Sequence, residues 1–596
     1  MGLAAPLASA QQLAGERVEN PIYFADSPIA SDALIRLPQL IAQDNLSEAS
    51  RLTDEIITTF GDRLIESTDP AISITVRQRL HRFVLDHPTL LAEYRKDTTP
   101  GTRALLEQGQ WERIARDAWL TEPGCTAALH QAQTLIEGAH FRAGLRALQE
   151  LESHPDATAH ANRAAKLAKL AARSTNTQAA WDVADRWSTR AGQTIQNRPP
   201  RLAPDSRSHT SINALAWNTD HTSDNNQPTL DGIVPRSLGR AHLTPYPELD
   251  SLPPVRNTAG SGANRIPTAW VSPVVLDDKL YTNDGITISC FDRFTLRPIW
   301  RLQTQQDIEN LPITPDARVR TGRVVEDTTT ITAVGDHLYV PAGLPQSGLR
   351  SDNRLLKIDA HTGKVIWGVD VTNLNIPTDD SANQDQLATG DTLSLASIRG
   401  QVIVDQGVVV FGARTNNRNQ RLVNLAVVGL DAATGSVLWI HHIASAGSLP
   451  FQQSGQIAQS PVLNDGTIYW TDQIGLAFAI EAATGTVRWA RPLPSPDVYA
   501  RFSRPSYSTS TPIINEHGMF ALTTDGTQII QLNKETGETI ATRNADPVGE
   551  ALYLLPVDLN GTDLIACVST NRITYYNAER FETATTLICS GFLLQF

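Results

Sequence analysis

The stretch Asp359-Ala-His-Thr-Gly-Lys-Val-Ile-Trp367 decides the fold, because the chain contains several copies of it. In the best copies an acid is followed by Gly and then by Trp at fixed spacing, with apolar runs on both sides. This predicts a strand, a tight turn and a second strand, since a carboxylate accepts backbone N–H bonds and Gly readily adopts left-handed conformations. The predicted framework residues are Asp292, Trp300, Asp359, Gly363, Trp367, Asp431, Gly435, Trp439, Gly485, Trp489 and Gly537.

The repeat weakens towards both ends of its region. The first copy has Leu296 in place of Gly, a later one has Ala541 in place of Trp, and a faint last copy spans 577–585. A second pair of apolar runs with hairpin signals precedes the copies. These pairs lie at 272–281, 332–340, 460–469 and 511–520. Four strands per unit, repeated about six times, predict an all-β propeller of four-stranded blades. Six blades are visible in the sequence, and a total of six to eight is possible.

This pattern resembles the pyrroloquinoline-quinone-like (quinoprotein-like) propeller repeat, in which a closing Trp docks against the neighbouring blade. The family includes quinoprotein dehydrogenases and the outer-membrane assembly lipoprotein BamB. The resemblance covers roughly residues 266–596. It implies a structural role for the shared Asp, Gly and Trp residues, with Trp367, Trp439 and Trp489 buried between blades.

Composition limits the classes of function. The chain has 596 residues, 41% hydrophobic and 19% charged, as expected of a globular protein with two or more domains. A net charge of −13 argues against a nucleic-acid partner, which would require a basic surface. The four cysteines are scattered without metal-ligand spacing, and no apolar run is long enough for a transmembrane segment.

The N-terminal half has a different pattern. Residues 1–10 resemble the end of a secretory signal peptide, although a small-residue tail is the alternative, and 11–32 are predicted to be an extended lead-in. Residues 33–192 show helical periodicity and predict an all-α array of helical hairpins, similar to tetratricopeptide repeats. Residues 193–265 are Pro-rich and aperiodic, which predicts a linker before the propeller at 266–596.

The spacing of the repeats predicts two unequal faces. Insertions at 302–328 and 371–398 lie between blades, and smaller ones at 344–353 and 414–421 lie between second and third strands. In an up-and-down blade both kinds of loop emerge on one face, which we call the loop face. The Thr-Gly turns emerge on the opposite face, the turn face. Binding residues are usually found on loops held by a rigid scaffold, which favours the loop face.

One loop on that face has the composition of a binding site. The segment 499–507 joins two blades and combines three aromatic residues with two arginines, the residue types that dominate interaction hot spots. The candidate partner-binding residues are Tyr499, Arg501, Phe502, Arg504 and Tyr507. The alternative is that these side chains only pack on a neighbouring blade.

The sequence offers little that points to catalysis. A quinoprotein dehydrogenase needs a Ca²⁺ site, an aromatic floor beneath the quinone and a catalytic Asp, and many have adjacent cysteines above the cofactor. This chain has no adjacent cysteines, and its repeat Trp residues occupy framework positions. His441 and His442 form a pair, but strand neighbours point to opposite faces, so we expect them not to share a metal ion. We therefore predict no catalytic, cofactor-binding or metal-binding residues and no cofactor.

The sequence favours a non-catalytic, exported scaffold of the bacterial cell envelope, similar to BamB. It is expected in the periplasm, where it would bind an envelope protein or extended peptide. Two alternatives remain open: a dehydrogenase that uses pyrroloquinoline quinone with Ca²⁺, and a propeller that binds polysaccharide or peptide. The sequence does not indicate the oligomeric state.

Overall fold

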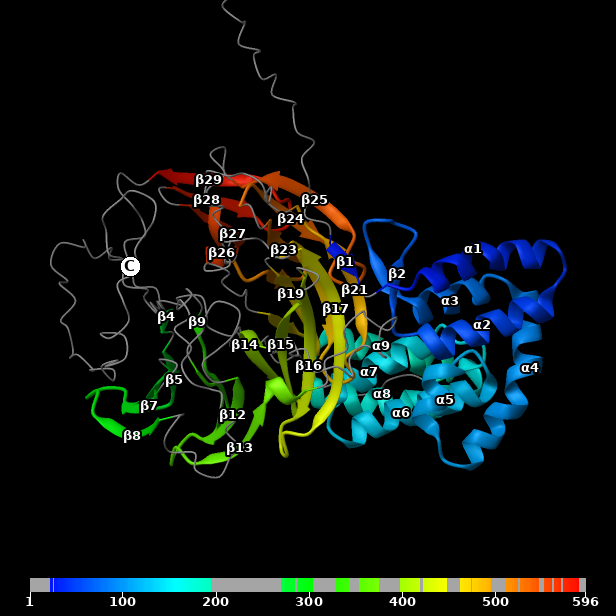
Figure 1. The fold of residues 1–596 in the computed structure, drawn as a ribbon, viewed down its shortest axis with the longest axis horizontal. Helices are drawn as coiled ribbons and strands as arrows, with labels where there is room; N and C mark the ends of the chain where they lie inside the picture. The colour runs from blue at the N-terminus through cyan, green and yellow to red at the C-terminus, as the bar shows by residue number, and fades with distance from the viewer. Residues whose placement is uncertain are drawn as a thin grey trace, which may run out of the picture.

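A computed structural model shows a helical N-terminal region followed by six antiparallel four-stranded units (Figure 1). It describes residues 22–193 except 25, and then 270–588 with gaps. The gaps are 272, 284–286, 304–327, 344–352, 375–396, 418–421, 448–460, 473, 495–509, 524–525, 546–550, 560–561 and 570–571. None of the described helices combines the length and the apolar character that a bilayer crossing requires.

The helical unit, residues 28–190, contains nine described α-helices. They are α1 (Pro28–Ala42), α2 (Leu46–Phe60), α3 (Val76–Leu85), α4 (Pro88–Glu107), α5 (Trp111–Asp117), α6 (Glu122–Glu137), α7 (Phe141–Leu151), α8 (Ala161–Thr175) and α9 (Gln178–Arg190), with a 3₁₀ turn at Ala157–His160. The helix α1 begins within the predicted extended lead-in, because Ser27 caps it and Pro28 favours the first turn. A short hairpin, β2 (Leu64–Glu66) and β3 (Ser73–Thr75), also interrupts the predicted all-α region.

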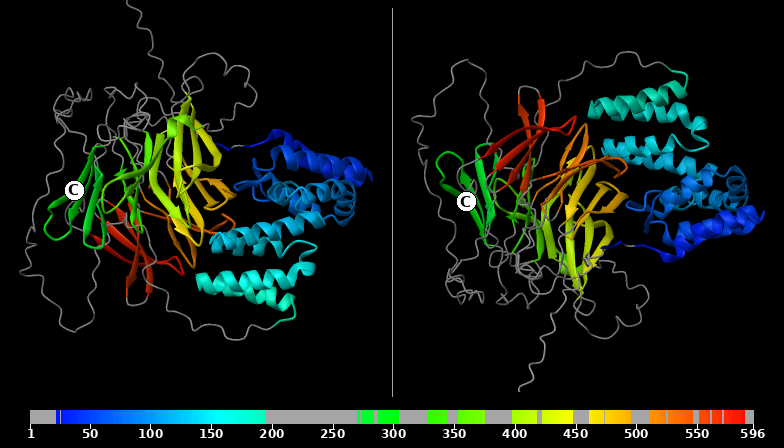
Figure 2. Two further views of the ribbon diagram at one scale, coloured as in Figure 1. Left: turned by 90° about the horizontal axis from the view of Figure 1, so that it is seen from below. Right: turned by 90° about the horizontal axis from the view of Figure 1, so that it is seen from above.

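The helices pack as antiparallel neighbours, α6 with α7 and α8 with α9 (Figure 2). Small side chains make this possible: α8 buries Ala164, Ala165 and Ala168, so that its backbone approaches its neighbours closely. Trp187 of α9 is fully buried, and its indole N–H donates to the carbonyl of Leu148 at 3.1 Å. The array of helical hairpins is therefore held by an alanine-lined core with a few large anchors.

Six four-stranded units form the blades, which we number along the chain. Blade 1 has β5 (Val274–Leu276), β6 (Lys279–Asn283), β7 (Thr287–Asp292) and β8 (Pro298–Gln303). Blade 2 has β10 (Thr332–Val334), β11 (His337–Pro341), β12 (Arg354–Asp359) and β13 (Val365–Asp370). Blade 3 has β14 (Ser397–Asp405), β15 (Val408–Asn417), β16 (Leu422–Asp431) and β17 (Val437–Gly447).

The remaining blades follow the same meander. Blade 4 has β18 (Val462–Asn464), β19 (Thr467–Asp472), β20 (Leu476–Glu481) and β21 (Val487–Pro492). Blade 5 has β22 (Ile513–Asn515), β23 (Gly518–Leu522), β24 (Gln528–Leu532) and β25 (Thr539–Asn544). Blade 6 has β26 (Ala551–Leu559), β27 (Thr562–Ser569), β28 (Arg572–Asn577) and β29 (Thr583–Ile588). Two short strands, β4 (Trp270–Val271) and β9 (Thr328–Thr329), pair outside the blades.

Apolar side chains between consecutive blades form the core of the propeller. The first strands of neighbouring blades contact one another from blade 1 through blade 6. One cluster joins Val410 and Leu425 of blade 3 to Trp470 and Phe478 of blade 4, all buried. Because strand residues alternate between the two sides of a sheet, each blade contributes to the core on both sides. The predicted fold class, a helical array followed by a propeller of four-stranded blades, is confirmed.

The first segment of the chain is attached to the outer edges of two blades. The strand β1 (Ile22–Phe24) pairs with Ala444–Ala446 of β17, which extends blade 3 to five strands. Ser73 of β3 pairs with Ala490 of β21, so the β2–β3 hairpin extends blade 4 to six strands. Figure 1 shows the helical unit beside blades 3 and 4. The structure thus shows the two halves in direct contact.

Limited proteolysis tests how the two halves are held together. We expect the first cut in the Pro-rich segment 193–265, on the sequence argument above. The fragments should then remain associated, because paired strands and the contacts of α7 described below join them without that segment. Size-exclusion chromatography of the cut protein should give one peak that contains both fragments. Two separate peaks would show that the strand pairing and the contacts of α7 are too weak to join the halves.

Candidate functional site

The Thr-Gly turns are built around one carboxylate each. In blade 2 the Oδ1 atom of Asp359 accepts hydrogen bonds from Thr362, at 2.8 Å from both the backbone nitrogen and the hydroxyl, and from the backbone nitrogen of His361 at 3.1 Å. These bonds, the Thr362 hydroxyl foremost, lower the pKa of Asp359. Asp292 and Asp431 make the same bonds in blades 1 and 3. These carboxylates are therefore occupied in holding turns.

Each repeat Trp lies on the Thr-Gly turn of the next blade. A Cβ atom added to Gly363 would lie 2.7 Å from the ring of Trp300, and one added to Gly537 would lie 2.6 Å from Trp489. The turn glycine is thus required both by its positive φ and by the indole pressed against it. The same relation joins Trp367 to Gly435 and Trp439 to Gly485.

The four indoles differ in burial and hydrogen bonding. Those of Trp300, Trp367 and Trp489 donate to carbonyls of the next blade at 3.0, 3.2 and 3.0 Å. Trp439 makes no such bond to any described residue. Trp489 is fully buried, whereas Trp367 and Trp439 are half-buried, so the expectation that all three are buried between blades is correct for Trp489 alone.

The interface between blades 5 and 6 reverses this arrangement. Ala541 stands in the Trp position of blade 5, and Phe581 stands in the Gly position of blade 6. The Phe581 ring is buried and lies 5.3 Å from the ring of Phe520, in an apolar cluster against which Ala541 also packs. Here the small residue is on the earlier blade and the large residue is on the later one, which is the opposite of the Trp-on-Gly arrangement. The sequence contained this signal, but only the structure shows that the two positions meet.

The turn face is partly covered by the helical unit. From α7, Arg146 donates to the hydroxyl of Thr467 and to the carbonyl of Asp465, the latter at 3.3 Å. One helical turn earlier, Arg142 lies 3.8 Å from Asp405 and 4.0 Å from Asp465, carboxylates in the first turns of blades 3 and 4. The turn face is therefore an interface between the two halves at these blades.

Blade 4 has Glu481 at the repeat position that is Asp in blades 1 to 3, and the contacts of its side chain account for the difference. Its Oε2 atom still accepts from the Thr484 hydroxyl at 2.7 Å, while its Oε1 atom lies 3.9 Å from Nε of Arg146. The longer side chain therefore serves the turn and the helical unit together. Burial raises the pKa of Glu481, and the charge of Arg146 opposes that rise.

A buried ion pair joins blades 3 and 4 near the loop face. The guanidinium of Arg414 contacts the carboxylate of Asp472, and the two side chains are only 4% and 1% exposed. The sequence predicted an inserted loop at 414–421, which would begin at Arg414. The structure instead extends β15 to Asn417, so that residue 414 lies on a strand that faces blade 4. Sequence reasoning missed this pair because its members are far apart in the chain.

The predicted partner-binding residues lie outside the described residues. This holds for Tyr499, Arg501, Phe502, Arg504 and Tyr507, and for most of the insertions that define the loop face. The described strands that flank segment 499–507 do fix where it attaches. It leaves β21 at the end opposite the turn at 481–485 and enters β22 at the end opposite the turn at 515–518, which is the loop face.

The two adjacent histidines of β17 have separate surroundings. The ring of His441 lies 5.8 Å from that of Trp439, and burial lowers the pKa of His441. His442 is buried instead beside Ser445, with Nε2 3.0 Å from the hydroxyl. Cys290 and Cys567 are buried in blades 1 and 6, and the indoles of Trp300, Trp367, Trp439 and Trp489 lie against turn glycines.

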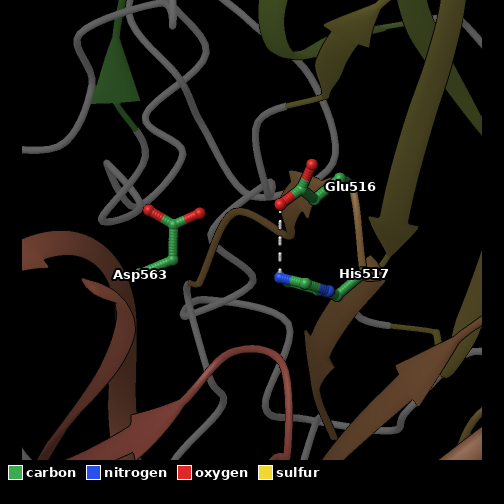
Figure 3. A group of neighbouring side chains, drawn as sticks. All are labelled: Glu516, His517 and Asp563. Atoms are coloured by element: carbon green, nitrogen blue, oxygen red, sulfur yellow. Dashed lines mark ion pairs between the residues drawn. The ribbon is translucent and has the colours of Figure 1, made fainter. Parts of the chain in front are cut away.

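One cluster of metal-ligand types occurs among the described residues. Glu516, His517 and Asp563 each offer a donor atom within 4.8 Å of the other two (Figure 3). They come from hairpin turns of blades 5 and 6 on the turn face. Sequence reasoning treated Asn515-Glu-His-Gly518 only as a hairpin signal, and Asp563 lies in the next blade.

Comparison with known proteins gives the family. The family model described as "Outer membrane protein assembly factor BamB" matches residues 250–561, which is more than half of the chain. The chain belongs to this family. The match confirms the resemblance drawn from the Asp-Gly-Trp repeat, and it covers blades 1 to 5 and the first strand of blade 6. No curated protein matches the chain.

Several solved structures match part of the chain. BamB from Moraxella catarrhalis is 14% identical with a TM-score of 0.31, over 53% of this chain and 73% of that one. Quinohemoprotein alcohol dehydrogenase from Comamonas testosteroni is 13% identical with a TM-score of 0.37, over 55% and 62%. The corresponding enzyme ADHIIG from Pseudomonas putida HK5 is 12% identical with a TM-score of 0.36, over 54% and 59%. At these identities the matches do not distinguish a scaffold from a dehydrogenase.

Proposed function

We propose that this chain is a non-catalytic, exported scaffold of the bacterial cell envelope, whose propeller binds a protein partner on its loop face. The observation that carries the proposal is the attachment of the helical unit to the turn face of blades 3 and 4. Because that contact occupies the turn face at these blades, the loop face of the same blades remains for a second protein. Membership of the BamB family supports a protein partner and an envelope location.

The use of the repeat residues supports a structural role for the propeller. Asp292, Asp359 and Asp431 hold their own turns, and Trp300, Trp367 and Trp489 donate to the next blade. These residues therefore stabilise the scaffold and are not available for catalysis or for a ligand. We propose that the chain acts without pyrroloquinoline quinone. The lack of adjacent cysteines in the sequence supports this proposal.

The segment 499–507 is the proposed anchor for the partner. It connects blade 4, which carries the β2–β3 hairpin, to blade 5, and it attaches on the loop face. Its aromatic and arginine side chains would supply the buried anchors of an interface with an envelope protein or an extended peptide. The rigid attachment of blade 4 to the helical unit would limit the entropy lost when this loop binds.

A capture experiment tests this site. The purified chain, immobilised, should retain a specific protein from envelope extracts, and the double substitution Tyr499→Ala/Phe502→Ala should weaken that capture by about tenfold or more, or ~1.4 kcal/mol. The matched control is Lys364→Ala, an exposed residue in the Thr-Gly turn of blade 2. A loss of capture in the control but not in the double variant would move the site to the turn face.

The dehydrogenase alternative has its own assay. The chain reconstituted with pyrroloquinoline quinone and Ca²⁺ should not reduce an electron-accepting dye in the presence of alcohols or sugars. Turnover in this assay would contradict the scaffold proposal. Affinity for a polysaccharide without turnover would instead favour a carbohydrate-binding propeller.

A further inference from the structure

We propose that Glu516, His517 and Asp563 bind a divalent transition-metal ion such as Zn²⁺, and that the ion fastens blade 5 to blade 6. Glu516 and His517 form the turn between β22 and β23, and Asp563 is near the start of β27. Figure 3 shows the two carboxylates and the imidazole around one space between these hairpins. The site would therefore join two consecutive blades of the propeller.

The geometry is close to that of a bound site. One donor atom from each of the three residues lies within 4.8 Å of the others, and Oε1 of Glu516 is 3.6 Å from Nε2 of His517. Zn²⁺ binds nitrogen and carboxylate oxygen at about 2.0–2.2 Å, which places its ligands roughly 3–4 Å apart. The Glu516 side chain is 80% exposed and can rotate to close this difference. Water would complete the coordination.

The backbone beneath the ligands is fixed. The nitrogen of His517 donates to Oδ1 of Asn515 at 2.9 Å, and its carbonyl accepts from Nε2 of Gln531 at 2.9 Å. The carbonyl of Asp563 accepts from the nitrogen of Ala578, also at 2.9 Å. Both hairpins are thus held in place by their own blades, so that binding would order only side chains.

The two carboxylates at this site would be stabilised by a cation. Among the described residues, neither Glu516 nor Asp563 pairs with a lysine or arginine, although the two carboxylates share one space. The corresponding corner of blades 1 and 2 offers a comparison. There His361 lies 3.1 Å from Asp336 and 2.7 Å from the ammonium of Lys279, which supplies the positive charge. Between blades 5 and 6 the ammonium of Lys534 donates instead to the backbone carbonyl of Asn515 at 3.4 Å, and among the described residues no ion pair joins it to Glu516 or Asp563.

The choice of metal follows from the ligands. An imidazole nitrogen favours Zn²⁺, Ni²⁺ or Cu²⁺ over Mg²⁺ and Ca²⁺, which prefer oxygen ligands alone. The position of the site in the propeller also suggests a structural role for the ion. Blades 5 and 6 lack the Trp-on-Gly contact that joins the earlier blades, because Ala541 and Phe581 occupy those positions. A metal ion would add a second connection at the turn face of this interface.

Calorimetry and thermal unfolding of the full chain test the site. After treatment with a chelator, Zn²⁺ should bind with one equivalent at this site and raise the melting temperature, whereas Mg²⁺ should do neither. His517→Ala and Asp563→Asn should each weaken Zn²⁺ binding by about tenfold or more, as expected when a ligand is lost. The matched control is His361→Ala, which removes the histidine from the corner that has its own lysine.

Three results would overturn the proposal. One is a wild-type protein that binds no Zn²⁺, and another is binding that survives both ligand substitutions. The third concerns the role of the ion: Zn²⁺ should slow hydrogen exchange of the β22–β23 and β26–β27 hairpins together. Protection of only one hairpin would show that the ion does not bridge the blades. Co²⁺ in place of Zn²⁺ would report the ligand set through its visible absorption.

Discussion

Replacing Trp489 by Ala is expected to lower the free energy of unfolding by about 3–5 kcal/mol, the range for removing a large buried aromatic side chain. The indole is fully buried, donates to the carbonyl of Lys534 at 3.0 Å and lies against Gly537 of the next blade. The substitution would therefore open a cavity between blades 4 and 5 and leave the partly buried carbonyl of Lys534 without its donor. Denaturant unfolding followed by circular dichroism would measure the loss.

The matched control is Trp439→Ala. This residue occupies the same repeat position and lies against Gly485, but it is half-buried and its nitrogen has no hydrogen-bond partner among the described residues. We expect it to lose clearly less stability than the Trp489 variant, because less apolar area is returned to water. Equal losses would mean that burial and hydrogen bonding do not set the strength of these contacts.

The propeller could be predicted because the sequence signals that determine it are local and repeated. The Asp, Gly and Trp positions each act within one turn or on the adjacent blade, so one copy explains the others. Asp359 and Gly363 hold a turn in the structure as the sequence suggested. Phe581 shows the limit of this reasoning: its place in the repeat was visible, but its match with Ala541 depends on packing between blades.

The attachment of the helical unit could not be predicted from such signals. The strands β1 and β3 are short, and they pair with β17 and β21 only because those edges are within reach in the folded chain. The single sequence trace of this contact is Glu481, which replaces the Asp of the repeat and lies near Arg146. A departure from a repeat can thus mark an interface, although the partner becomes known only from the structure.

The two candidate sites also differ in whether the sequence indicates them. The aromatic–arginine segment 499–507 was found from composition and stays a prediction, since it lies outside the described residues. The cluster of Glu516, His517 and Asp563 was missed, because two ligands are neighbours in a turn and the third is in another blade. Sites that are assembled across blades leave no motif in the sequence.

Replacing Arg414 by Met should also lower the free energy of unfolding by about 3–5 kcal/mol, the range for breaking a buried ion pair. The variant leaves the carboxylate of Asp472, whose side chain is 1% exposed, between blades 3 and 4 without its guanidinium. The remaining hydrogen bond, from the nitrogen of Ile474 at 3.0 Å, does not neutralise the charge. Denaturant unfolding would measure the effect.

Two further variants separate the cause of that loss. The double substitution Arg414→Met/Asp472→Leu removes both charges, and it should recover most of the stability, because apolar pairs of similar volume often replace buried ion pairs without penalty. The control Arg142→Ala removes a half-exposed arginine that lies 3.8 Å from Asp405 and 4.0 Å from Asp465, so we expect a loss of about 0–1 kcal/mol. If the double variant were as unstable as Arg414→Met, the loss would come from the shape of the arginine side chain and not from an uncompensated charge. In that case the interface between blades 3 and 4 would depend on packing at this point, as it does around Trp470 and Gly412.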